Sequence, residues 1–373
     1  MTEIKTNLGK LRLQRGISAI QLASVVGISR QTIYAIEAGT YVPNTAVALR
    51  LARALESSVE DLFALADQTS EHNSRNESAL LLPGSDTLAA GQGVQLCQVD
   101  KKLVASAPSP VPWFFPLADA VVTDKPARPG KTPIQIFQSN GDFNSRILVA
   151  GCDPAISVLS RYALSDGVEL VLAHRNSTQA LALLKQGCIH VAGTHLSHDP
   201  GGESNLLEIN RLFPKNTVAV ITFAVWEQGI VTARDNLKNI RGIQDFPRKD
   251  ISIINRESGA GARTLLDAQL KKLNIQPNKV KGYANLASGH LAAAWQVLSG
   301  AADCCLSTRA AARVFGLHFI PLLNERYDLV IRRPHLDLPR MQNLLDTLSR
   351  ADFRRELEGL GGYDTRVTGQ RLL

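Results

Sequence analysis

The sequence predicts a small all-α module at the N-terminal end, followed by a larger α/β domain with two lobes. Two observations lead to this fold class. Residues 8–65 carry apolar side chains at helical spacing between glycines and cap residues, and strand and helix patterns alternate from about residue 145 onward. The stretch between them, residues 66–144, fits neither pattern. A length of 373 residues suits two or three domains.

Composition excludes several classes of protein. With 45% hydrophobic and 20% charged residues, the chain can build a core, which excludes wholesale disorder. The densest apolar run, residues 218–226, is far shorter than the roughly 18 residues of a membrane span. The first ten residues, MTEIKTNLGK, lack the pattern of a secretory signal. Five cysteines, two of them adjacent, do not suit a disulfide framework, so we expect a cytoplasmic protein.

The first module is predicted to contain a helix-turn-helix. Ser18 and Ser29 are positioned as N-caps of two short helices, and Gly27 lies in the turn between them. A helix precedes this pair, and two more are expected over residues 44–55 and 58–65, which together would form a five-helix bundle.

The charge of this module is divided along the chain. Residues 1–34 carry five basic residues and one acidic residue, a balance of +4, whereas residues 35–70 carry a balance of −3. The whole chain has a net charge of +7. A module with one basic side is typical of proteins that contact phosphates.

The stretch LGKLRLQRGISAIQLASVVGISRQTIYAIEAGTYVPNTAVALRLARALESSVEDLF resembles the repressor-like helix-turn-helix family of the Xre or Cro/C1 type. The resemblance implies that the third helix lies in the major groove of double-stranded DNA. The base readers it implies are Arg30, Gln31 and Thr32, with Ala35 or Tyr34 next along the exposed face. Ser29, which caps this helix, is also expected to bind DNA. Gln21 and Asn44 would contact phosphates. A helical bundle that binds protein instead is the alternative.

Residues 67–92 are polar and are expected to form a flexible linker, leading into a β-rich connecting segment over residues 93–144. A hairpin is predicted over residues 93–107. The aromatic cluster of Trp113, Phe114 and Phe115 either binds a ligand or another subunit, or packs under a proline-rich loop.

Residues 145–373 are expected to form a mostly parallel α/β domain. One lobe would comprise residues 145–225 and 320–373, and the other residues 230–318. In such sheets ligands bind where strands end and helices begin. The residues at these junctions that we expect to bind a ligand are Cys152, Asp153, Arg175, Asn176, Ser177, Thr178, Thr194, His195, Arg256, Ser258, Gly259, Ala260, Gly261, Arg263, Ser288 and His290.

The chemistry of these junctions favours an anion. Helix N-termini carry partial positive charge, and Arg175, Arg256 and Arg263 could add full charges. Each junction alone is also compatible with ordinary cap and turn residues, so the prediction depends on the set, and mainly on SGAGART at 258–264.

The sequence does not contain the motifs of several other ligand-binding and catalytic sites. The SGAGART loop has neither the lysine of a Walker A loop nor a GxGxxG pattern, and no GxSxG elbow is present. His190, His195 and His198 with Asp199 fit no standard zinc spacing, so no metal site and no cofactor are predicted.

The segments GCDPAI, HRNSTQALALLKQGCIHVAGTHLSHDPGGESN, INRESGAGARTLLD and GYANLASGHLAAAWQVLSGAADCCLSTRAAARVFGLHFIPLLNERYDLVI resemble the periplasmic-binding-protein-like domain fused to bacterial helix-turn-helix regulators. A related domain occurs on some molybdopterin-biosynthesis proteins. The resemblance implies a cytoplasmic sensor with a cleft between lobes. It suggests molybdate, tungstate or a molybdenum-cofactor-related ligand, and a larger organic anion stays open.

The resulting hypothesis is a ligand-responsive transcription regulator, a homodimer or higher oligomer, that binds operator DNA and a small anion and is not an enzyme. Two alternatives remain. One is an enzyme or binding protein for a cofactor precursor, using Asp153, His195 or Glu227. The other is a DNA-tethered interaction protein with an unused cleft.

Overall fold

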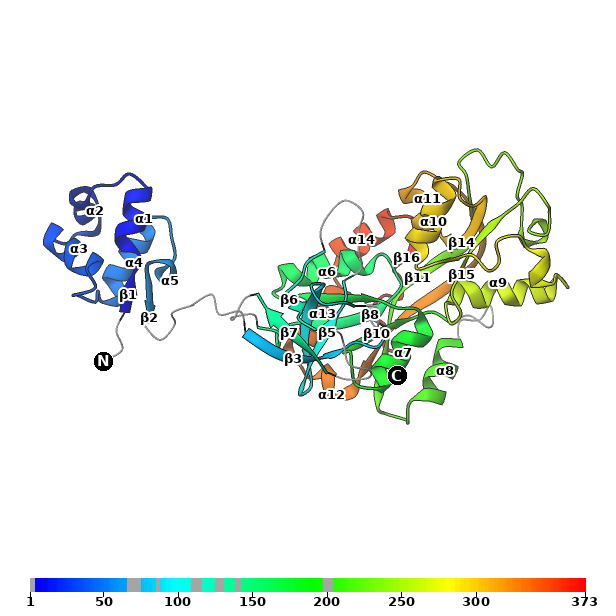
Figure 1. Cartoon of the computed structure of the whole chain (residues 1–373), viewed down its shortest axis with the longest axis horizontal. Coiled ribbons are helices and arrows are strands. Elements are labelled where there is room, and N and C mark those ends of the chain that lie inside the picture. The colour runs from blue at the N-terminus through cyan, green and yellow to red at the C-terminus, as the bar shows by residue number, and fades with distance from the viewer. Residues whose placement is uncertain are drawn as a thin grey trace. The chain divides into compact units, whose positions relative to one another are not determined.

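The computed structural model describes residues 4–65, 75–84, 88–108, 116–124, 131–137, 142–196 and 204–373. The chain divides into two compact units, Met1–Asn73 and Ser74–Leu373 (Figure 1). Part of the expected linker, the aromatic cluster at 113–115, and His198 with Asp199 lie outside the described residues.

The N-terminal unit contains α1 (Leu8–Gln14), α2 (Ala19–Val26), α3 (Arg30–Glu37), α4 (Thr45–Ala54) and α5 (Val59–Leu62). Ser18 and Ser29 cap α2 and α3, as predicted, and Gly27 ends α2 with a φ of 76°, which favours glycine. The predicted helix over 58–65 is wrong at its end. Residues Phe63–Leu65 form β2, which pairs antiparallel with β1 (Ile4–Thr6).

One ion pair links the first and third helices of this unit. The Arg12 guanidinium donates to Glu37, with Nε 2.6 Å from Oε1, and also donates to the Ile17 carbonyl. The two side chains are only 10% and 14% exposed. Arg12 therefore fixes α1 against the last turn of α3, beside a core that includes Leu22, Ile33 and Leu51.

The second unit begins with a closed barrel in the strand order β3-β5-β4-β6-β7. Its strands are β3 (Arg75–Leu81), β4 (Gly93–Val99), β5 (Lys102–Ser106), β6 (Ala120–Val122) and β7 (Lys131–Ile136). The predicted hairpin is β4 and β5. The flexible linker predicted over 67–92 is wrong at β3, where the chain forms a strand. The sequence did not indicate this strand, because Ala79 and Leu81 are its residues in the barrel core and they are too few to give an alternating apolar pattern.

The rest of the second unit is built on a nine-stranded sheet in the order β13-β12-β14-β11-β15-β10-β8-β9, with β16 (Tyr363–Asp364) paired to β11. The remaining strands are β8 (Ile147–Gly151), β9 (Leu170–His174), β10 (Val191–Thr194), β11 (Val218–Thr232), β12 (Ile253–Arg256), β13 (Leu286–Ala287), β14 (Cys304–Thr308) and β15 (His318–Arg332). Gly282, at φ 86°, turns the chain just before β13, which pairs parallel with β12.

Helices cover the sheet in two groups, which define two halves (Figure 1). The first half carries α6 (Ile156–Ser165), α7 (Ser177–Lys185), α8 (Ser204–Leu212), α12 (Arg333–Leu336), α13 (Pro339–Thr347) and α14 (Ala351–Gly359). The second carries α9 (Gly261–Lys272), α10 (His290–Leu298) and α11 (Arg309–Val314). Helix α14 follows the predicted final helix and packs Phe353 and Leu357 into the core of the first half.

Two long antiparallel strands, β11 and β15, pass through both halves. Val220 and Phe223 of β11 pack in the cores of the first half, whereas Ile230 and Val231 pack in those of the second. The register shifts between Gln228 and Gly229, where the two groups of side chains meet. The halves are therefore joined by one continuous ribbon.

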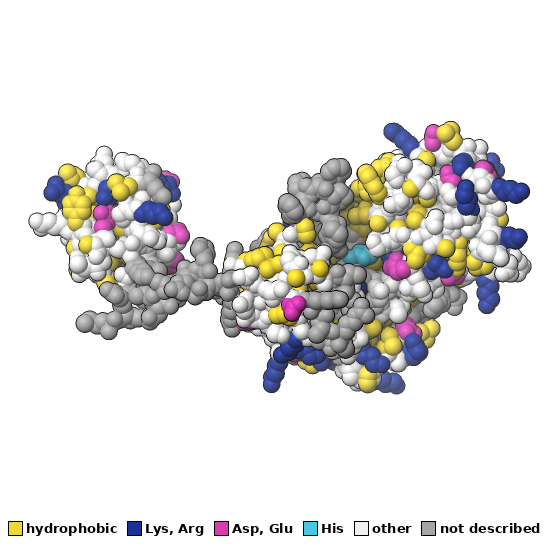
Figure 2. All heavy atoms as spheres, viewed as in Figure 1, with side chains coloured by type: hydrophobic (Ala, Val, Ile, Leu, Met, Phe, Trp, Pro, Cys, Tyr) yellow, Lys and Arg dark blue, Asp and Glu magenta, His cyan; other side chains and the backbone are white. Residues whose placement is uncertain are grey.

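No helix in the part of the chain that the structure describes is long and apolar enough to cross a membrane. Figure 2 shows lysine and arginine side chains gathered at the end of the second unit that carries α9 and its neighbouring loops.

The Arg12–Glu37 pair should carry much of the stability of the N-terminal unit. We expect Arg12→Ala to lower its free energy of unfolding by about 2–3 kcal/mol, because the substitution leaves a largely buried carboxylate without its partner. Hydrogen exchange of residues 8–62 in the full-length chain measures this. Arg15→Ala is the matched control, since the Arg15–Glu56 pair is 44% and 84% exposed and should change stability by under about 1 kcal/mol. Equal effects of the two variants would contradict the assignment.

Candidate functional site

Strand-to-helix junctions from the two halves meet at one interface. The Asn176 amide of the first half donates to the Ser258 carbonyl of the second at 3.2 Å, and the Thr178 hydroxyl donates to the Gly259 carbonyl at 3.2 Å. The loop of Ser288 joins them, since Gly289 lies against His174. The three junctions on which the predicted site depends thus lie together.

Local sequence explains why these loops approach so closely. Asn176 caps α7 in a capping box with Gln179, which leaves its Nδ2 free to reach the other half. A Cβ on Gly261 would lie 2.5 Å from the His195 ring, and a Cβ on Gly289, at φ 99°, would lie 2.7 Å from His174 Nε2. Only glycine allows this contact between backbone and imidazole.

A buried row of side chains runs through the interface. Cys152, which follows β8, has its Sγ 3.3 Å from His195 Nε2, and His195 Nδ1 lies 2.8 Å from Glu325 Oε2. The Gln228 amide, with its nitrogen facing the carboxylate, donates to Glu325 Oε1 at 3.1 Å. All four residues are buried. Glu325 and Gln228 come from β15 and β11, so the connecting ribbon orients the imidazole.

The pKa values of the titratable side chains in and beside this row depend on burial and on the charges of their neighbours. Burial disfavours an imidazolium, but the Cys152 sulfur and the Glu325 carboxylate outweigh it and raise the pKa of His195 to about 10. Burial raises the pKa of Asp153 to about 6, although Tyr363 donates to this carboxyl at 2.6 Å. Burial and the nearby Arg256 lower the pKa of His290. The pKa values of the two neighbouring imidazoles are therefore shifted in opposite directions.

Arg256 places a guanidinium at this interface. The residue is 1% exposed, and its Nε and Nη2 donate to Glu257 at 3.2 Å each. Its Nη1 has no partner among the described residues. The same holds for three nitrogens near it, His290 Nε2, His174 Nε2 and Trp226 Nε1, and for four nitrogens elsewhere in the unit, on Arg326, Arg333, His335 and Arg340. Because buried polar groups almost always find partners, the group around Arg256 is a candidate ligand site.

The distances between ring centroids show that the side chains carrying these nitrogens are neighbours. The Trp226 and His290 ring centroids are 5.1 Å apart, and those of His195 and Trp226 are 4.8 Å apart. His174 lies against the loop that begins α10.

Two of the three predicted arginines do not join this group. Arg175 extends to the barrel, where Nη2 donates to the Pro83 carbonyl at 3.1 Å. Arg263 pairs with Asp267 and lies 4.1 Å over the Tyr283 ring, with Nη1 donating to the Arg256 carbonyl. Tertiary structure sets these contacts of Arg175 and Arg263. Of the three predicted arginines, only Arg256 therefore directs its charge into the interface.

The other predicted residues lie around the interface in different roles. Ser177 Oγ bridges the backbone N–H and C=O of His195. Thr194 and Ala260 are buried, while Thr178, Ser258 and Ser288 are exposed at the edge. Glu227, considered for catalysis, instead pairs with Arg309.

Sequence reasoning missed His174, Trp226, Gln228, Glu325 and Tyr327, which complete the site. Tyr327 is fully buried, and its hydroxyl accepts the backbone N–H of Cys152 at 3.2 Å. All lie inside or at the end of strands, away from the strand-to-helix loops that were predicted to form the site. Glu325 is the first buried residue of β15, whose preceding residues are exposed or half-buried.

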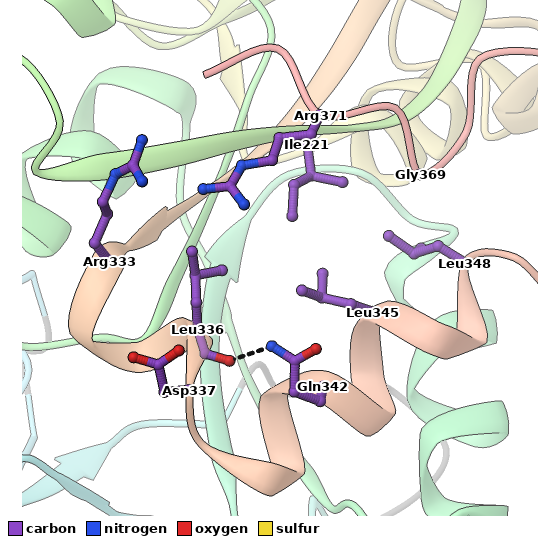
Figure 3. A pocket seen from close by; sticks show the side chains of 9 residues that line it. All are labelled: Ile221, Arg333, Leu336, Asp337, Gln342, Leu345, Leu348, Gly369 and Arg371. Atoms are coloured by element: carbon purple, nitrogen blue, oxygen red, sulfur yellow. Dashed lines mark hydrogen bonds between the residues drawn. The ribbon is translucent and has the colours of Figure 1, made fainter.

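One cavity lies next to this interface and another lies elsewhere in the second unit. A hollow of about 510 Å³ is bordered by Gly151, Asp153 and His174 and continues to barrel residues such as Gln95. Another, of about 470 Å³, lies between β11, α12, α13 and the C-terminal segment, and Arg333 and Arg371 extend into it (Figure 3). The second contains none of the predicted site residues.

In the N-terminal unit the predicted base readers lie together on the first turns of α3. Arg30 and Gln31 are exposed on α3, and the Arg30 guanidinium lies 5.6 Å from the Tyr34 ring centroid. Ser29 Oγ accepts the Thr32 N–H at 3.0 Å, and Ala35 is half-buried. The two predicted phosphate contacts have structural roles as well, since Gln21 Oε1 accepts the Ser18 N–H and Asn44 Oδ1 accepts the Val47 N–H.

Contact between the halves should depend on the absence of a side chain at Gly261. We expect Gly261→Ala to lower the stability of the second unit by about 1–3 kcal/mol, because its Cβ would overlap the buried His195 ring. Thermal unfolding of the full-length chain measures this. The control is Gly359→Ala, at the end of α14 with open space around its Cβ, which should be neutral or slightly stabilising. A neutral Gly261→Ala would show that the halves do not close this tightly.

Comparison with known proteins agrees with both units. Residues 8–62 match the helix-turn-helix family model, and residues 160–349 match the PBP superfamily domain. The chain is 32% identical to the Bacillus subtilis protein YvgK over 67% of its own length and 80% of that protein. It is 38% identical to YgzD, an HTH-type transcriptional regulator of the same organism, over 17% of this chain and 98% of that protein.

Similarity to solved structures is more distant. The sulfate-binding protein SubI of Mycobacterium tuberculosis aligns with a TM-score of 0.46 at 14% identity, covering 58% of this chain and 86% of that protein. The tungstate ABC transporter protein of Geobacter sulfurreducens aligns with a TM-score of 0.44 at 12% identity, covering 57% and 98%. From its family matches and its similarity to YvgK, the chain belongs to the PBP superfamily and carries a helix-turn-helix domain of the Xre type at its N-terminal end.

Proposed function

We propose that this protein is a ligand-responsive DNA-binding transcription regulator, in which a small anion binds between the halves of the PBP-like domain. The observation that supports this most strongly is the buried Arg256 guanidinium, whose Nη1 has no partner among the described residues. A buried charged donor without an acceptor is costly, and an anion would satisfy it.

The surrounding groups restrict the size and charge of the anion. Arg256 is already paired with the Glu257 carboxylate, and the remaining donors, on His290, His174 and Trp226, are neutral. Buried carboxyls of Asp153 and Glu325 lie nearby and would repel a large polyanion. A compact oxyanion held mainly by neutral donors fits this balance best. Molybdate, tungstate, sulfate and phosphate are the first ligands to test.

Regulation would follow from closure of the two halves. The donors belong to both of them, His174 to the first and Arg256 and His290 to the second, so an anion in contact with both binds the closed form better. We propose that closure alters the relative placement of two helix-turn-helix modules in a homodimer. Operator half-sites one helical turn apart would then bind with a ligand-dependent affinity.

Anion binding should depend on Arg256 and not on Arg175. We expect Arg256→Met to weaken binding of the preferred oxyanion by about 10- to 100-fold, as lost charged hydrogen bonds typically do. Arg175→Met, whose side chain reaches the barrel, should bind as the unsubstituted protein does. Isothermal titration with each oxyanion, after elemental analysis of the purified protein, measures this. Equal affinities of the two variants would contradict the proposed site.

The DNA-binding proposal has a separate test. We expect Arg30→Ala to relax base preference at one operator position by about 1–3 kcal/mol, because an arginine can bond a guanine edge bidentately. Arg53→Ala, near the end of α4, should preserve the preference. Gel shifts on randomised operator DNA, with and without the oxyanion, report both base preference and coupling. Operator binding that no bound ligand alters would contradict regulation by the sensor.

A further inference from the structure

Three side chains with metal-binding chemistry gather at the centre of the interface. Cys152, His195 and His290 each offer one donor atom, these atoms lie within 4.8 Å of one another, and all three residues are buried. Sequence reasoning predicted no metal site, because His190, His195, His198 and Asp199 fit no standard zinc spacing, and it did not consider Cys152 and His290, which are distant in the chain. We infer that these three side chains bind a transition-metal ion of the zinc or copper(I) class.

The distances suit a shared ion. Zinc bonds of about 2.3 Å to sulfur and about 2.0 Å to nitrogen place the two ligand atoms roughly 3.5 Å apart in a tetrahedral site. Cys152 Sγ and His195 Nε2 are 3.3 Å apart. The His290 donor atom lies within 4.8 Å of the other two and would have to move closer to complete the set.

Each imidazole has one nitrogen engaged and one directed at the group. His195 Nδ1 is held by Glu325 at 2.8 Å, the carboxylate–histidine arrangement that commonly supports metal ligands. His290 Nδ1 lies 3.4 Å from Ser307 Oγ, and that hydroxyl donates to the His290 carbonyl. His290 Nε2 is buried and has no partner among the described residues. This unpartnered nitrogen is a second, independent indication of a ligand.

The balance of charge also favours a cation. With His195 neutral, as a metal-bound imidazole is, a Cys152 thiolate and the Glu325 carboxylate would bring two negative charges into a buried space. The opposing charge, on Arg256, is engaged by Glu257 on two of its nitrogens. A divalent ion would compensate the thiolate and the carboxylate directly. One sulfur and two nitrogens select zinc or copper(I) over magnesium or calcium, which require oxygen ligands.

The ligands belong to both halves of the domain. Cys152 and His195 follow β8 and β10 of the first half, and His290 begins α10 of the second. A bound ion would therefore stabilise the closed arrangement. Three protein ligands also leave one coordination position for an exogenous group. This inference does not rest on the proposed anion, and it replaces one of its donors, because His290 Nε2 cannot donate to an anion while it binds a metal. A protein that takes up the metal but no oxyanion supports this inference and contradicts the anion proposal.

The test is metal binding by the full-length protein. After chelator treatment, Co(II) is added as a spectroscopic probe, and Zn(II) affinity is then measured by competition. We expect one ion per chain, with a thiolate-to-cobalt charge-transfer band and tetrahedral visible bands. Cys152→Ser should abolish the charge-transfer band, and His290→Ala should lower Zn(II) affinity about 100-fold or more. Glu325→Gln, acting through His195, should lower it about 10- to 100-fold.

Cys188→Ser is the matched control, since Cys188 is a buried thiol whose Sγ contacts the Gln186 carbonyl, and it should leave binding unchanged. The unsubstituted protein supplies the charge-transfer readout even if one variant fails to fold. A protein that takes up no Co(II) or Zn(II), or that binds them equally after Cys152→Ser, overturns the inference. A Cys152 thiol that reacts rapidly with iodoacetamide while no metal binds overturns it too and identifies a reactive thiol instead.

Discussion

The antiparallel pairing of β11 with β15 is the constraint on which the PBP-like domain depends. These strands are the covalent and hydrogen-bonded link between the halves, and their register shift at Gln228 lies where the two sets of cores meet. They also supply Trp226, Gln228, Glu325 and Tyr327 to the interface. In the proposed closure, the ribbon that bends is also the one that orients His195, which would couple ligand binding to closure through the same residues.

Burial gives the interface its chemical character. In water, a cysteine, two histidines and an arginine would be unremarkable neighbours. Enclosed between two halves, each charge must be compensated by a specific partner, as Glu325 does for His195 and Glu257 does for Arg256. The nitrogens without partners among the described residues then become the most informative atoms in the domain, because they record what the protein alone does not supply.

The N-terminal unit was the most predictable part of the chain. Caps at Ser18 and Ser29, the turn at Gly27 and the apolar spacing are local signals, and each lies where the sequence indicated. The barrel was not predictable in the same way. Strand β3 takes its partners from β5 and β7, up to about sixty residues away, and exposes most of its polar side chains. A strand defined by distant partners leaves no periodic signal of its own.

By itself the sequence determined the helix-turn-helix, the alternation of strands and helices, and the junctions at Asn176, Ser258 and Ser288 that meet in the fold, since caps, turns and glycines act over a few residues. Tertiary structure alone decided the site's chemistry. It turned Arg175 toward the barrel and Arg263 onto Tyr283, and it brought Cys152, His195 and His290 together across more than a hundred residues. The physical reason is that side-chain direction and burial depend on packing between distant segments, which spacing along the chain does not encode.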